Sequence, residues 1–328
     1  MTAQTVPFEH FVDDALYGDD GFYTVGGSAG RRGDFLTSPE VGPLFGAVVA
    51  RFLDAEWERL GRPDRFTVHE VGAGPGTLAR AVLAARPACA SALDYVAVEI
   101  SPVQRARHPA GVASAVTLPS GPLRGVVLAN ELLDNLAFRL AVHDGGWREA
   151  FVLVDGEQRS EVLSAPFDPV PSVLPVSAPL GARAPLVDRA GGWVADVVGR
   201  LDGVLIAFDY FVPTTAELAG RPWREWLRTY RAHERGQHYL IAPGTQDITT
   251  EVPIDQLPPP DAVRSQAQWL QLHGIDELVA EGRRIWTEQA AAPGLEALRM
   301  RSRISEAEAL LDPAGLGAFT VCEWRRGG

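Results

Sequence analysis

The 328-residue sequence contains no lysine, so all 30 of its fixed positive side chains are arginines. Without lysine, the protein can form no Schiff base with a carbonyl compound and cannot bind a nucleotide phosphate through a Walker A loop. The formal net charge is −12, and the arginines gather only in short pairs such as Arg31-Arg32 and Arg325-Arg326. This charge would repel a nucleic-acid backbone, so we expect no nucleic-acid partner.

Cysteine is nearly absent, and long apolar runs are absent altogether. Cys89 and Cys322 are too few for a disulfide framework, and neither the cysteines nor the seven histidines have the spacing of a zinc site, so we expect no metal. No apolar run approaches the length of a membrane-spanning helix, and the first residues lack the basic and apolar regions of a signal peptide. We therefore expect a cytoplasmic protein without membrane insertion.

The hydrophobic pattern predicts an α/β fold. Apolar residues recur at helical spacing from Ser38 to Gly61, and further helices are expected at 77–86, 186–201, about 263–281 and 295–311. Strands are expected at 65–71, 95–100, 125–130, 204–208 and 319–324, with an antiparallel excursion near 147–154 and a proline-rich loop at 166–185. Continuous apolar strands separated by helices indicate a parallel sheet covered on both faces.

A glycine-rich turn follows the first of these strands. Gly72, Gly74 and Gly76 would let backbone amides and a helix N-terminus approach a ligand closely. Their spacing is G-x-G-x-G, whereas the dinucleotide fingerprint needs G-x-G-x-x-G, so S-adenosylmethionine (SAM) is favoured over NAD. Glu99 lies at the end of the next strand, 27 residues beyond Gly72, where a carboxylate can accept hydrogen bonds from both ribose hydroxyls. The two features together indicate cofactor binding.

A second polar group follows the strand at 125–130. Asn130, Glu131 and Asp134 are expected at the same sheet edge, and if a helix begins there the two acids share one face. Acids in a first helical turn can also do no more than offset the helix dipole. Methyl transfer suits such a site, because a sulfonium is already activated and the protein need only align donor and acceptor. Paired carboxylates could grip a guanidinium and accept its proton.

Several segments together resemble the MidA family of class I SAM-dependent methyltransferases, whose mitochondrial members are protein arginine methyltransferases that assist assembly of respiratory complex I. The residues that carry the resemblance are Gly33-Asp34-Phe35-Leu36-Thr37-Ser38-Pro39-Glu40, Glu70-Val71-Gly72-Ala73-Gly74-Pro75-Gly76-Thr77-Leu78, Val98-Glu99-Ile100-Ser101-Pro102, Ala129-Asn130-Glu131-Leu132-Leu133-Asp134, Phe208-Asp209-Tyr210 and Pro243-Gly244-Thr245-Gln246-Asp247-Ile248-Thr249. They span most of the chain. The chain departs from the family pattern at Ala73 and Pro75, at Asn135-Leu136-Ala137, at Phe211 and at Glu251.

The resemblance implies a Rossmann-like class I methyltransferase sheet with an N-terminal helical lid segment at 1–64 and a methyltransferase domain at 65–328. Family-specific insertions would lie at about 139–185 and 213–312. The cofactor would be SAM, with Gly72, Gly74 and Gly76 at its methionine part. Glu99 would bind the ribose beside Ile100, and Asp34, Thr37 and Ser38 would belong to the lid. Asn130 and Glu131 would border the transferred methyl, with Asp134 as a further catalytic acid.

The resulting expectation is a SAM-dependent methyltransferase that modifies an arginine on a partner protein. Two other classes stay open: a non-catalytic assembly or binding protein on the same scaffold, and an NAD-dependent oxidoreductase, which the glycine spacing disfavours. The sequence does not identify the methyl acceptor, and the oligomeric state stays open, a homodimer included.

Overall fold

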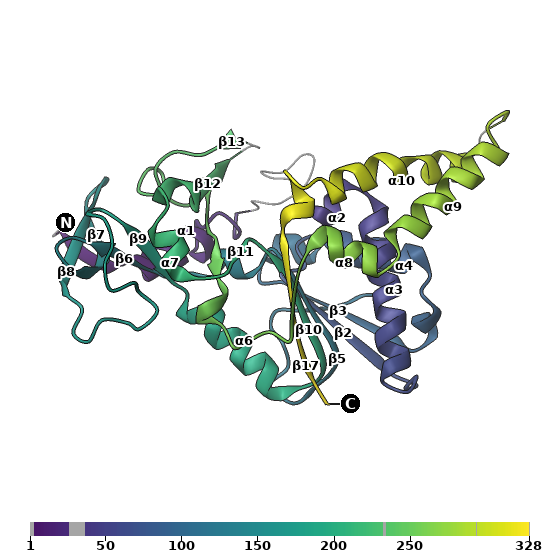
Figure 1. Ribbon diagram of the computed structural model, residues 1–328, viewed down its shortest axis with the longest axis horizontal. Coiled ribbons are helices and arrows are strands. Elements are labelled where there is room, and N and C mark those ends of the chain that lie inside the picture. Colours follow the sequence, from purple (N-terminus) through teal and green to yellow (C-terminus); the bar gives the residue numbers. More distant parts are fainter. Residues whose placement is uncertain (1–2, 26–36, 232–233, 293, 328) are drawn as a thin grey trace.

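The computed structural model describes residues 3–25, 37–231, 234–292 and 294–327, and a seven-stranded sheet lies at its centre (Figure 1). Its strand order is β16-β17-β10-β5-β2-β3-β4. β2, β3, β4, β5 and β10 run parallel, while β17 is antiparallel to both of its neighbours. The strands are β2 (Phe66–Val71), β3 (Leu93–Val98), β4 (Ala113–Ala115), β5 (Leu123–Asn130), β10 (Leu201–Asp209), β16 (Ala262–Ser265) and β17 (Thr320–Arg326). The predicted Rossmann-like sheet is thereby confirmed.

Helices cover both faces of this sheet, which explains why its strands are apolar without alternation. Along β5, Val126 and Leu128 belong to one buried cluster with α3, α4 and α8, whereas Val127 and Ala129 belong to another with α1 and α6. The bounds of these helices are α1 (Phe8–Tyr17), α3 (Pro43–Arg59), α4 (Thr77–Ala85), α6 (Asp188–Arg200) and α8 (Gln266–Leu272). The sheet thus has a separate apolar core on each side.

A second sheet packs beside the first and contains most of the expected insertion at 139–185 (Figure 1). Its order is β1-β7-β6-β9, and β8 pairs with β7. The strands are β1 (Gln4–Pro7), β6 (Arg139–His143), β7 (Trp147–Asp155), β8 (Gln158–Pro166) and β9 (Arg183–Leu186). Because β1 pairs with β7, the N-terminal segment joins this sheet and carries α1 with it.

The segment expected as a second insertion at 213–312 contributes to several parts of the fold. A three-stranded sheet of order β13-β12-β14 and the pair β11-β15 lie within or beside it, whereas β16 is the edge strand of the central sheet. The bounds are β11 (Phe211–Val212), α7 (Thr215–Ala219), β12 (Leu227–Arg231), β13 (Glu234–Arg235), β14 (Asp247–Thr250) and β15 (Val252–Pro253). Elsewhere in the described chain, short elements connect the longer ones. They are the helix α5 (Pro102–Arg105) and the 3-10 turns η1 (Ala88–Ser91), η3 (Trp223–Glu225), η4 (Ile254–Gln256) and η5 (Leu316–Ala318), with η2 described below.

The helix predicted from Ser38 to Gly61 is two helices, α2 (Ser38–Val41) and α3. Gly42 separates them in an extended conformation, and Pro43 begins α3, because a residue before proline is disfavoured in the helical region. The carboxylate of Glu306 accepts the Leu44 N–H at 2.8 Å and so satisfies one donor of the new helix N-terminus. A Cβ at Gly42 would lie 2.3 Å from the Glu306 carboxyl carbon, so this contact requires glycine.

The single helix predicted at about 263–281 is also wrong. The chain forms β16, then α8, and turns at Gly274, whose φ of 85° favours glycine, before α9 (Ile275–Glu288) begins. Ser265 ends the strand and begins α8 through a capping box with Gln268. The predicted helix at 295–311 is confirmed as α10 (Leu295–Leu311). Within the described residues, no helix combines the length and apolarity needed to cross a membrane.

Two helical glycines allow a matched test of how closely α3 and α4 pack. A Cβ at Gly46 of α3 would lie 2.3 Å from the Ala81 Cβ of α4, whereas a Cβ at Gly192 of α6 would meet no atom within 4 Å. Both Gly→Ala changes gain about 1 kcal/mol in helix propensity. We expect Gly192→Ala to raise the free energy of unfolding and Gly46→Ala to lower it by about 1 kcal/mol or more, because α4 must move away. Denaturant unfolding followed by circular dichroism measures both, and equal stabilisation would contradict the close packing.

Candidate active site

A cavity of about 790 Å³ lies at the edge of the central sheet where β2, β3 and β5 end. Residues that follow these three strands form one part of its wall. Other lining residues come from α1, α2, α4, α5 and α6 and from the segment after β4, so the cavity lies between the sheet and the N-terminal segment. In an open parallel sheet this edge collects strand ends and helix N-termini, which makes it the usual position of a ligand.

The glycine turn forms one wall of the cavity. Gly72 and Gly74, two of the residues expected at the cofactor, have φ values of 70° and 51° and line the cavity. Gly76, with φ 74°, is not among the lining residues, because it packs against the His108-Pro109 segment. A Cβ at Gly76 would lie 2.9 Å from Pro109, so this glycine permits a close approach of backbone segments.

Glu99 lies beside this turn, at the end of β3. Its Oε2 accepts the Gly74 N–H at 2.9 Å, and its Oε1 accepts the Ser101 N–H at 2.7 Å. The side chain is 8% exposed and lines the cavity, so each oxygen still has a lone pair for a ligand hydroxyl. Ile100 and Val116 flank it with 57% and 52% of their surface exposed, which offers apolar contacts to a flat base.

The N-terminal residues expected at the cofactor divide into three groups. Thr37 lines the cavity and is 7% exposed. Ser38 is fully buried and donates its hydroxyl to Gln266 Oε1 at 2.8 Å, so it faces α8 instead of the cavity. Asp34 lies outside the described residues.

Asn130 and Glu131 line the cavity at the end of β5. Glu131 has a φ of 51°, and its carboxylate accepts hydrogen bonds from Tyr210 Oη at 3.2 Å and Asn130 Nδ2 at 3.3 Å. Burial, with a smaller contribution from the negative charge of Asp134, raises the pKa of Glu131 to about 8 against those two hydrogen bonds. Glu131 is therefore an acid that can hold or release a proton near neutral pH.

Asp134 does not share a helical face with Glu131, so that expectation is wrong. The left-handed conformation at Glu131 is followed by a 3-10 turn, η2 (Leu133–Asn135), and Asp134 points into the interior, 3% exposed. Thr249 Oγ1 donates to its Oδ2 at 2.6 Å, and Asn135 Nδ2 donates to its Oδ1 at 3.1 Å. Burial raises the pKa of Asp134 to about 6. Asp134 is not among the residues that line the cavity, so it can support the wall but does not face a ligand.

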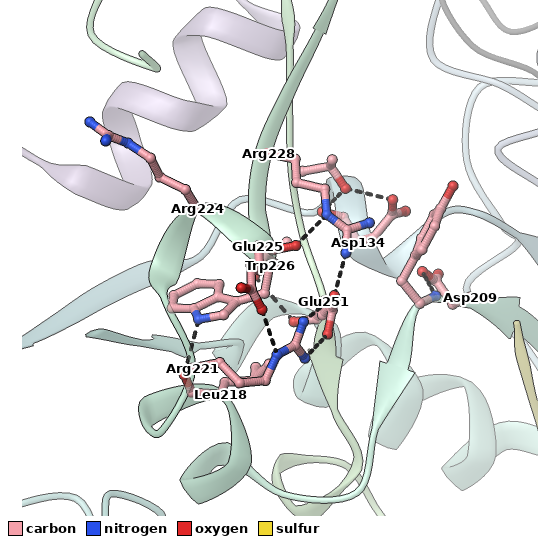
Figure 2. A network of polar contacts seen from close by, with 12 residues as sticks. Asp134, Asp209, Leu218, Arg221, Arg224, Glu225, Trp226, Arg228 and Glu251 are labelled. Atoms are coloured by element: carbon pink, nitrogen blue, oxygen red, sulfur yellow. Dashed lines mark hydrogen bonds and ion pairs between the residues drawn. The ribbon is translucent and has the colours of Figure 1, made fainter. Parts of the chain in front are cut away.

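A network of arginines and acids lies beside Asp134 and Asp209 (Figure 2). Glu251, 7% exposed, accepts hydrogen bonds from Arg221 at 2.6 and 3.1 Å and also binds Arg228. The Arg228 guanidinium lies 5.8 Å from the Tyr210 ring centre. Its positive charge partly offsets the increase that burial causes in the pKa of Asp134. Asp209 is fully buried and accepts the Leu133 and Tyr210 N–H groups, but burial and the charge of Asp134 still raise its pKa.

The family departures at Phe211 and Glu251 meet in this region. β11 and β15 are parallel partners, with Phe211 opposite Val252, so the two departures lie on adjoining backbone. Phe211 is buried, 7% exposed, and is not among the residues that line the cavity.

Residues from α1, from the segment after it and from α6 also line the cavity, although no sequence motif predicted them. Tyr17 and Tyr23 stack with ring centres 5.6 Å apart, and the Tyr17 hydroxyl donates to the Asn135 carbonyl at 3.1 Å. Trp193 and Arg200 approach from α6. No local motif marks these residues, because long-range packing brings α1 and α6 to the sheet edge.

The cavity is strongly acidic. Among the described residues its lining contains six carboxyl groups and one guanidinium; the carboxyl groups belong to Asp13, Glu40, Glu70, Glu99, Glu131 and Asp196. Burial raises the pKa of Glu70, like that of Glu131, to about 8, so these two are mostly protonated at pH 7. The Arg200 guanidinium is bound to Asp196 and to the carbonyls of Pro119 and Gly121. The cavity therefore suits an elongated nucleoside with positive charge, such as SAM. In the described parts of the chain, no group of three or more His, Cys, Asp or Glu side chains could hold a metal ion.

The chain is similar to known proteins in both sequence and fold. Residues 48–274, more than half of the chain, match a family model described as "Putative S-adenosyl-L-methionine-dependent methyltransferase". A crystal structure of a COG1565 superfamily member from Burkholderia thailandensis, bound to S-adenosyl-homocysteine, superposes with a TM-score of 0.83 at 26% identity, covering 98% of this chain and 88% of that one. Its native form gives a TM-score of 0.82 at 25% identity, with the same coverage of both chains.

Two curated relatives are named protein arginine methyltransferases. The mitochondrial NDUFAF7 homolog of Drosophila melanogaster is 29% identical over 77% of this chain and 65% of its own length, and NDUFAF7 of Homo sapiens is 25% identical over 72% and 61%. The chain thus spans less than two thirds of the length of each. The family model and the fold agree with the resemblance found in the sequence: the chain belongs to this family of S-adenosyl-L-methionine-dependent methyltransferases.

Proposed function

We propose that this protein transfers the methyl group of SAM to a guanidinium nitrogen of an arginine side chain on a partner protein. The observation that carries the proposal is the Glu131 carboxyl group, which lines the same acidic cavity as the glycine turn and Glu99. The names of the two curated relatives support the same acceptor.

Each end of the cavity has a separate task in this proposal. Gly72, Gly74 and Glu99 would hold the cofactor, with the carboxylate on the ribose hydroxyls and Ile100 and Val116 against the base. When bound, SAM supplies a methyl group on a positively charged sulfur. The acidic lining, which contains one guanidinium among the described residues, favours that charge and also a cationic acceptor, whereas a carboxylate or phosphate acceptor would be repelled.

Glu131 would orient the acceptor and remove its proton. A guanidinium has a pKa above about 12, so its nitrogen becomes a useful nucleophile only if a base accepts a proton as the new bond forms. The S–CH₃ bond breaks as the N–CH₃ bond forms, the electron pair of the broken bond stays on sulfur, and the proton passes from nitrogen to the Glu131 carboxylate. An incoming guanidinium favours the ionised form of Glu131, because opposite charges at short distance lower a carboxyl pKa.

The direct test replaces Glu131 by glutamine, which keeps the size of the side chain and removes its charge. We expect Glu131→Gln to reduce methyl transfer from labelled SAM to lysate proteins by about 100-fold or more, with S-adenosylhomocysteine binding retained. The matched control is Glu217→Gln, because Glu217 is an exposed residue of α7 that does not line the cavity, and this variant should keep full activity. Scintillation counting and mass spectrometry of the modified side chains are the measurements. Label on residues other than arginine, or transfer unaffected by Glu131→Gln, would contradict the proposal.

The rate of methyl transfer should depend on pH through the ionisation of Glu131. Because the pKa of Glu131 is raised to about 8, the group is protonated below that pH and unable to accept a proton. We expect kcat/KM at limiting SAM and acceptor to rise with pH and to reach half of its plateau near pH 8. A flat profile between pH 6 and 9 in the wild-type protein would count against Glu131 as the base.

The third prediction separates activity from folding. A carboxyl group whose pKa is raised on folding makes the native state bind more protons than the unfolded state between about pH 4.5 and 8, so this group lowers stability as pH rises through that window. Glu131→Gln removes this pH-dependent cost. We expect the variant to be at least as stable as wild type at pH 9 in denaturant unfolding. A large loss of stability there would show that Glu131 holds the fold in its ionised form.

A further inference from the structure

We propose that His108 is a positioning residue for the cofactor loop, because its ring hydrogen-bonds the backbone of Gly74. His108 Nε2 lies 2.9 Å from the Gly74 carbonyl oxygen, and His108 Nδ1 lies 2.9 Å from Ser114 Oγ. His108 is not among the residues that line the cavity. It therefore acts on a ligand through the loop.

The direction of this hydrogen bond follows from its acceptor. A backbone carbonyl only accepts, so Nε2 carries the proton that is shared with Gly74. In the neutral ring, Nδ1 then accepts from the Ser114 hydroxyl.

His108 and Glu99 together fix both peptide units that meet at Gly74. The Gly74 N–H donates to Glu99 Oε2 at 2.9 Å, and the Gly74 carbonyl accepts from His108 Nε2. Glycine loses more backbone freedom on ordering than any other residue, so a loop with three glycines in five positions costs free energy to order. Because these two hydrogen bonds are present before the ligand arrives, less conformational entropy of the loop is lost when the ligand binds.

The segment that carries His108 is itself held in place. Arg105 Nη1 donates to the carbonyls of Glu99 and Ile100 at 2.7 and 2.6 Å. Arg80, on α4 after the loop, donates to the Arg107 carbonyl at 3.1 Å. These contacts fasten the residues around His108 to β3 and to α4. The segment around His108 is therefore held by contacts with the residues after β3 and with α4, in addition to its own contact with the loop.

The test compares three substitutions of one side chain. His108→Gln places an amide N–H donor near the position of Nε2, His108→Asn places one near Nδ1 only, and His108→Ala removes both. Calorimetric titration of the full chain with S-adenosylhomocysteine gives the dissociation constant. We expect His108→Ala and His108→Asn to bind about tenfold more weakly, and His108→Gln to stay within about threefold of wild type.

Hydrogen exchange supplies a local readout. Peptides that cover 72–78 should exchange faster in the Ala and Asn variants and at wild-type rate in the Gln variant, while the unfolding midpoints should differ little because the His108 side chain is only half-buried. Unchanged affinity in the Ala and Asn variants, or equal weakening in all three, would overturn the proposal. S-adenosylhomocysteine binding needs no methyl acceptor, so this outcome is independent of the arginine proposal.

Discussion

The cofactor side of the cavity depends on the hydrogen bond between the Glu99 carboxylate and the Gly74 N–H, which joins the ends of two parallel strands. β2 and β3 bring the two residues together, and the second oxygen of Glu99 binds the Ser101 N–H. A carboxylate that is 8% exposed would be costly without such partners. The backbone donors offset that cost, and they hold the carboxylate beside the cavity with lone pairs to spare.

The acids of the neighbouring strand end show how environment separates the roles of similar side chains. Asp134 accepts a short hydrogen bond from Thr249 and lies within the field of Arg228, both supplied by the sheet β13-β12-β14. Glu131 has only two longer hydrogen bonds and no arginine partner among the described ion pairs. Its proton is therefore held more tightly than that of Asp134, although both carboxyl groups belong to one short segment. The sheet β13-β12-β14 thus stabilises Asp134 behind the cavity wall, whereas Glu131 lines the cavity.

Local patterns in the sequence predicted the central sheet well and the helix boundaries less well. The apolar strands and the helices α4, α6 and α10 were recognisable because their periodicity persists over enough residues. Proline at position 43 indicates a helix boundary at Gly42-Pro43. The apolar residues keep the same helical spacing on both sides of it, so the periodicity alone predicted one continuous helix. The break at Gly274 had a similar local signal, and the strand β16 before it is too short for its alternation to stand out.

By itself, the sequence determined that a glycine turn, Glu99 and the Asn130-Glu131 pair meet at one sheet edge, because parallel strands bring their carboxyl ends together and each of these groups directly follows a strand. Only the tertiary structure decided where the other side chains point. Asp134 turns inward because the backbone at Glu131 is left-handed and because Thr249 donates a hydrogen bond to its carboxylate. Thr249 lies 115 positions further along the chain. Tyr17 and His108 reach the site through contacts with Asn135 and Gly74, which are 118 and 34 positions away. Such contacts depend on packing between distant segments, and no spacing along the chain records them.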